Sequence, residues 1–197
     1  MNKSLKEEAE KLLQIKGMTK GSEILTLAHY IESKHGKKEV WTLERKLEEL
    51  GCPIHFNEIE PAIWYPESWI VLGMIVAKEL FDWKDLYDIG YNSPVFSFGV
   101  RVFMKFLPLK AFVTQIPGYW RKFLDFGEIE GLISTEEKNC GTVRLKNYMF
   151  HPDMCLYFAG FFLRLAEYVI KSKKITIKET KCIYKGDSYH EYVFKWL

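Results

Sequence analysis

The C-terminal part of the chain contains four side chains of the types that bind metal ions: Cys155, Glu179, Cys182 and His190. Two thiolate sulfurs, one imidazole nitrogen and one carboxylate oxygen form a complete set for four-coordinate zinc. Because protein atoms would fill all four positions, such a site would be structural and would leave no vacancy for a reactive water. We therefore predict a zinc site and no catalytic residue.

Regular patterns predict the elements that position these side chains. Apolar residues at steps of three and four predict a helix over 152–171. Cys155 falls in its first turn, where the helix dipole favours thiolate over thiol. Two strands, over 175–183 and 189–196, are joined by a short loop that predicts a hairpin. The hairpin would bring its cysteine and its histidine together, and the helix would supply the second cysteine.

The spacing within the first strand of this hairpin is an obstacle to a shared ion. Glu179 precedes Cys182 by three residues, so a regular strand would point the two side chains to opposite faces. A bulge or turn near Thr180 is needed for both to reach one ion. A purely structural interpretation also stays open, with Cys155 as a core thiol, Cys182 as a half-buried strand residue and His190 as a hydrogen-bonded histidine.

The remaining pattern predicts an α+β fold in one domain. Strands over 128–134 and 142–148 precede the long helix, so residues 127–197 form a β-β-α-β-β unit with a helix on an antiparallel sheet. Residues 1–126 are predicted to be mainly helical. The expected helices cover residues 4–16, 22–36, 41–50, 67–81, 84–89, 94–106 and 109–126.

Length and composition exclude several classes of protein. The 197 residues are 48% apolar and 27% charged, which is ordinary for a globular domain and unlike a disordered or fibrous chain. The net charge of +2 provides no polyanion-binding footprint, so nucleic acid is not expected as a partner. The N-terminus lacks a secretory pattern and no apolar run is long enough for a membrane span, so we expect a cytoplasmic protein.

The C-terminal segments resemble the 4-vinyl-reductase-type domain of aromatic-sensing bacterial regulators. The similar features are Cys182 at the end of a strand, Gly186 in the turn, an aromatic-rich strand from His190, and the early helix cysteine Cys155. The resemblance implies a structural zinc held by a helix cysteine, a glutamate (here Glu179) and two hairpin residues. Histidine in place of the last hairpin cysteine departs from the family pattern, but it is an acceptable zinc ligand.

This resemblance also implies a function in sensing or binding a small hydrophobic or aromatic molecule. Tyr119, Trp120 and Phe123 lie where the family has residues of an enclosed ligand cavity. Their alternative role is in a packed core, to which the 31 aromatic residues of the chain would contribute. The family further implies a homodimer, and a separate output protein is expected because the chain has no ATPase or DNA-binding segment.

Three alternative functions remain. A tetrapyrrole vinyl reductase would need an electron source, and no nicotinamide or flavin motif is present. TRAPP-complex subunits have a related fold around a buried acyl chain, which would make the protein a structural or assembly factor. The haem–nitric-oxide-binding domain is also helical first and α+β later. Its Tyr-x-Ser-x-Arg motif is absent here, so haem is not expected, although His29, His35 and His55 are available as ligands.

Overall fold

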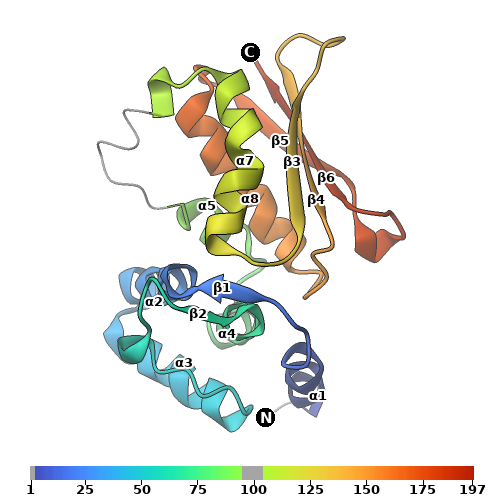
Figure 1. Ribbon diagram of the computed structural model, residues 1–197. Helices are drawn as coiled ribbons and strands as arrows, with labels where there is room; N and C mark the ends of the chain where they lie inside the picture. Colours follow the sequence, from blue (N-terminus) through green and yellow to red (C-terminus); the bar gives the residue numbers. More distant parts are fainter. Residues whose placement is uncertain (1–2, 95–103) are drawn as a thin grey trace. The chain divides into compact units, whose positions relative to one another are not determined.

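The computed structural model describes residues 3–94 and 104–197, which form two compact units (Figure 1). The first consists of Met1–Leu86 with Phe123–Asp125, and the second of Tyr87–Lys122 with Phe126–Leu197. Helices and antiparallel sheets are both present, which confirms the α+β class. Most of the helix expected over 94–106 lies outside the described residues.

The first unit is mainly helical and is built around α4 (Glu67–Leu80). Every residue from Ile70 to Ala77 is buried, and a helix that is apolar on all sides must be enclosed by other elements. Gly36 has φ +92°, which lets the chain turn sharply between two surrounding helices. The other helices of this unit are α1 (Lys3–Leu12), α2 (Gly21–His35), α3 (Lys37–Glu49) and the 3-10 turn η1 (Phe56–Glu58).

A short two-stranded ribbon in the first unit was not predicted. Strand β1 (Met18–Lys20) pairs antiparallel with β2 (Trp64–Pro66), with Thr19 opposite Tyr65. Three residues are too few for an alternating pattern to be recognised in a sequence. The pairing is supported by the side chain of Asp125, which accepts a hydrogen bond from the backbone N–H of Met18 at 2.7 Å.

The second unit contains a four-stranded antiparallel sheet in the order β3-β4-β6-β5. The sheet and the helix between its two hairpins reproduce the predicted β-β-α-β-β order. Buried and less buried residues alternate along β4, as expected where one face packs on the core. The strands are β3 (Glu128–Ile133), β4 (Cys140–Lys146), β5 (Ile175–Lys181) and β6 (His190–Trp196).

Two long helices lie on the same side of this sheet (Figure 1). Helix α7 (Leu109–Phe123) packs on β3 where Gly131 leaves room for the side chains of Val113 and Ile116. Helix α8 (Met154–Val169) packs against β5 and β6, and it crosses the short α5 (Tyr87–Asn92). The fold thereby places the first turn of α8 against the β5–β6 end of the sheet. Among the described residues, no helix combines the length and apolar character of a membrane span.

Candidate metal centre

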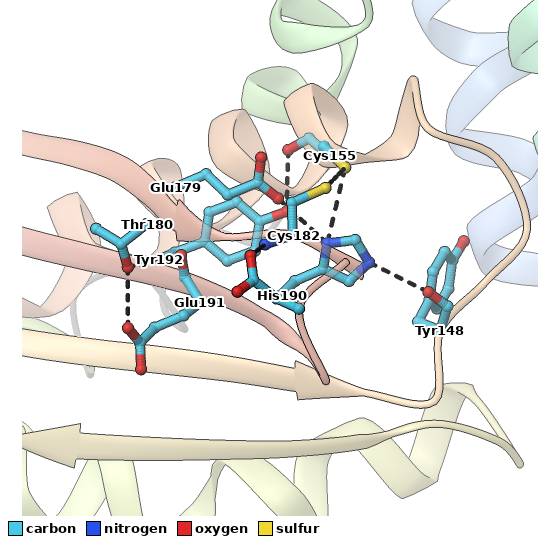
Figure 2. Close-up of polar contacts among 9 residues, drawn as sticks. Tyr148, Cys155, Glu179, Thr180, Cys182, His190, Glu191 and Tyr192 are labelled. Carbon is cyan, nitrogen blue, oxygen red and sulfur yellow. Dashed lines mark hydrogen bonds and ion pairs between the residues drawn. The ribbon is translucent and has the colours of Figure 1, made fainter. Parts of the chain in front are cut away.

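Cys155, Glu179, Cys182 and His190 converge on one point of the second unit (Figure 2). One donor atom from each residue lies within 4.8 Å of the donor atoms of the other three. Cys155 comes from the first turn of α8, Glu179 from β5, and His190 from the start of β6. Cys182 directly follows β5. The structure therefore brings together all four side chains that the sequence suggested as ligands.

The spacing of the donor atoms suits a tetrahedral ion. The sulfurs of Cys155 and Cys182 are 3.5 Å apart, and Cys155 Sγ lies 3.7 Å from His190 Nδ1. His190 Nδ1 is 3.1 Å from Glu179 Oε1. A tetrahedral ion with bonds of about 2.1–2.3 Å needs ligand atoms roughly 3.4–3.8 Å apart. Small side-chain shifts would bring the four atoms to that arrangement.

A bulge at the end of β5 allows Glu179 and Cys182 to face the same site. Glu179 pairs with Tyr192, but Lys181 pairs with Glu191, so Thr180 is an extra residue in the ladder. The Thr180 hydroxyl donates to a carboxylate oxygen of Glu191 at 2.9 Å and so turns away from the cluster. The irregularity that the chemistry required near this threonine is therefore present.

The tautomer of His190 directs one ring nitrogen towards the cluster. His190 Nε2 lies 3.2 Å from the carbonyl oxygen of Tyr148, to which it can only donate. In a neutral imidazole, Nδ1 would then carry a lone pair that faces the carboxylate of Glu179. These two lone pairs repel each other unless a positive charge lies between them. A second proton on the ring or a metal ion would supply that charge.

Backbone contacts hold the helix start and the hairpin turn in place around the cluster. The buried Tyr192 hydroxyl donates to the carbonyl oxygen of Cys155 at 3.1 Å. Asp187 accepts a hydrogen bond from the backbone N–H of Cys182 at 2.8 Å, and Gly186 closes the turn with φ +96°. Neither Tyr148 nor Tyr192 was predicted to take part in the site, although strand alternation places Tyr192 on the same face as His190, which lies two residues before it.

The electrostatics of the cluster favour a cation. Burial raises the pKa of the Cys155 thiol far above its usual range, and the charge of Glu179 and the neighbouring Cys182 raise it further. Burial also acts to raise the pKa of Glu179, but hydrogen bonds with His190 and Cys155 outweigh it and hold that pKa below its usual value. The carboxylate of Glu179 thus faces the Cys155 thiol, which does not ionise easily beside it. A metal ion would offset the negative charge of the Glu179 carboxylate and would favour the thiolate forms of the cysteines that bind it.

The predicted ligand-binding aromatic residues occupy different environments. Trp120 is buried, donates from its indole N–H to the carbonyl oxygen of Phe126 at 2.9 Å, and packs beside Tyr148. Tyr119 and Phe123 are each 40% exposed. Trp120 thus has the contacts of a core residue, and the role of all three in ligand binding stays a prediction.

Comparison with solved structures identifies the fold. A Shewanella oneidensis H-NOX protein in the Fe(II)NO state aligns with a TM-score of 0.64 and 17% identity, over 90% of this chain and 99% of its own. The fold is that of H-NOX domains. The H-NOX domain of the same organism in the Fe(II)CO state gives 0.61 and 18%, over 90% and 98%. An oxygen-binding H-NOX domain related to soluble guanylate cyclases gives 0.59 and 15%, over 89% and 92%. No protein-family model and no curated protein sequence matches the chain.

These similarities correct the expectations about family and cofactor. They do not support the resemblance to the 4-vinyl-reductase-type domain. The expectation of zinc, with haem not expected, was wrong because these structural neighbours are haem-binding domains. That expectation relied on the absence of the Tyr-x-Ser-x-Arg motif, which specifies only three residues. A fold depends instead on apolar residues distributed along the whole chain, so it is retained at 13–18% identity.

The histidines of this chain do not fit an axial position on haem iron. All five lie among the described residues. His29, His35 and His55 are exposed on the first unit. His151 is half-buried and accepts a backbone hydrogen bond at Nδ1. His190 is buried, but both of its ring nitrogens have partners. No buried imidazole nitrogen is thus left to bind haem iron.

Proposed function

We propose that this protein is a small-molecule-sensing domain in which a metal ion ties the β5–β6 hairpin to α8. The observation that carries the metal centre is the convergence of four donor atoms within 4.8 Å. Two thiols, an imidazole and a carboxylate suit a divalent transition-metal ion that prefers sulfur and nitrogen ligands. Because the protein supplies four ligands, the ion has a structural role.

The sensing role is supported by the fold. The structural neighbours include domains in complex with nitric oxide, carbon monoxide and oxygen, and they cover about nine tenths of this chain. A fold can carry different ligands in different proteins, so the ligand must be measured for this chain. A homodimer and a separate output protein remain part of the proposal.

Gas sensing through haem is the second candidate function, favoured by the haem chemistry of a structural neighbour. Because none of the histidines of this chain is placed to bind iron, haem would need another axial ligand. The test is to express the chain with a haem precursor and to titrate the purified protein with haemin. A stoichiometric Soret band that shifts with nitric oxide or carbon monoxide would support haem-based sensing. A haemin spectrum that matches the free compound would refute it.

Elemental analysis of the purified protein tests the metal centre. We expect about one equivalent of a transition metal, which is lost when Cys182 is replaced by alanine. Cys140→Ala is the matched control, because Cys140 is also a buried thiol but lies on β4 outside the cluster. Metal-free protein from several preparations, or equal metal content in both variants, would contradict the proposal.

A further inference from the structure

A groove of about 400 Å³ runs between α8 and β5 in the second unit. The helix contributes Leu156, Ala159 and Leu163 to its walls, and the strand contributes the segment 175–177. Cys155 and Glu179 of the candidate metal centre also line the groove. Leu156 is 46% exposed, and both isoleucines of the strand segment are half-buried. The groove therefore presents accessible apolar surface beside the first three residues of β5.

The backbone of β5 forms part of the groove wall. This strand is last in the order β3-β4-β6-β5, so no described strand pairs with its other side. Ile175, Thr176 and Ile177 all line the groove, although their side chains alternate between the two faces of the sheet. A free strand edge can pair with an added extended chain, whose alternate side chains would then enter the groove.

The charge along this edge selects between possible occupants. The segment 171–181 contains five lysines and a single glutamate. Lys173, Lys174 and Lys178 are exposed, and none of them forms an ion pair with another described residue. Lysines on an edge strand oppose pairing with a like-charged strand, which includes the same edge of a second copy of this chain. They attract a strand with acidic residues.

We propose that the edge of β5 and the adjacent groove bind an extended acidic segment of a partner protein. Backbone hydrogen bonds to β5 would provide the pairing, and apolar side chains at alternate positions would fill the groove beside Leu156 and Leu163. The lysines would provide selectivity for acidic residues at the positions between them. The strand edge and its lysines exist without the ion, so the pairing itself does not require the metal centre, although Cys155 and Glu179 border the groove.

A synthetic peptide tests the proposal. The probe is a capped heptapeptide of alternating glutamate and valine, titrated into the full chain and followed by backbone amide NMR. We expect saturable shifts centred on the amides of residues 175–177. A peptide with lysine in place of glutamate should not bind. A peptide that is N-methylated at its valines keeps the charge but loses backbone donors, and it should bind at least about tenfold more weakly.

Charge reversal on the protein provides the matched test. The double variant Lys174→Glu/Lys178→Glu removes two attractions and adds two repulsions, so we expect about 10- to 30-fold weaker binding of the acidic peptide. Lys11→Glu/Lys16→Glu makes the same change in net charge on exposed residues of the first unit and should leave binding unchanged. Equal binding by both variants, or by the N-methylated peptide, would overturn the proposal. So would dimerisation that is lost in Lys174→Glu/Lys178→Glu. Unchanged peptide binding after metal removal would confirm that the two proposals are separate.

Discussion

Removal of the metal ion should destabilise the second unit by an amount that follows from the chain length between its ligands. Cys155 and Cys182 are separated by 27 positions, and a metal that bridges them closes a loop of that length. The entropy of closing such a loop in the unfolded chain corresponds to about 3.5 kcal/mol at 25 °C. For a protein of this size, that difference corresponds to a decrease in melting temperature of roughly 7 to 14 °C.

Differential scanning calorimetry of metal-loaded and chelated protein measures this change. In Cys182→Ser, which cannot complete the bridge, chelation should no longer shift the melting temperature. In Cys140→Ser the chelation shift should keep its full size, whatever the stability of the variant itself, because Cys140 lies outside the cluster. Equal shifts in the two variants, or no shift in the parent protein, would refute the reasoning.

Three further predictions concern pH and packing. Metal affinity should increase at least about tenfold per pH unit between pH 6 and 8. The raised pKa of Cys155 means that the thiol must lose its proton when the metal binds. Isothermal titration calorimetry in buffers of different ionisation enthalpy measures this proton release. Burial raises the pKa of Glu23 to about 7, so its contribution to stability is fully present below about pH 4.5 and is lost as the pH rises through 7. Glu23→Gln should therefore stabilise the protein by about 1–2 kcal/mol at pH 8 and by little at pH 4, as measured by urea unfolding. Equal effects at the two pH values would contradict a raised pKa of Glu23. Gly160→Ala should cost about 2 kcal/mol or more, because its Cβ would meet the carbonyl oxygen of Tyr87 on α5; Gly118→Ala, whose Cβ meets nothing within 4 Å, should be neutral or slightly stabilising.

The C-terminal β-β-α-β-β order could be predicted because its patterns are long and regular. The helix containing Cys155 carries apolar residues over four turns, and burial alternates along the seven-residue strands β4 and β5. The ribbon of β1 and β2 could not be predicted, because each strand has three residues and no period. The start of α3 was placed four residues late, since the first three residues of the helix, Lys37 to Glu39, are all charged.

The candidate site was predictable in its ligands but only partly in its surroundings. Ligand chemistry alone indicated that Glu179 and Cys182 need a bulge between them, and the register shift provides it. The contact between His190 and Tyr148 could not be foreseen, because it uses a backbone carbonyl that every residue type possesses. The expectation about the cofactor failed for a different reason. It relied on the absence of one short motif, whereas the fold is encoded by residues along the whole chain.

The most direct test of the central claim is the absorption spectrum of the protein loaded with cobalt(II), which reports ligand type and geometry together. We predict saturation at one equivalent, intense visible bands of a tetrahedral ion, and charge-transfer absorption from two thiolates that falls by half in Cys155→Ser and in Cys182→Ser. A weak octahedral spectrum without thiolate charge transfer, unchanged in both variants, would contradict a metal centre at Cys155, Glu179, Cys182 and His190.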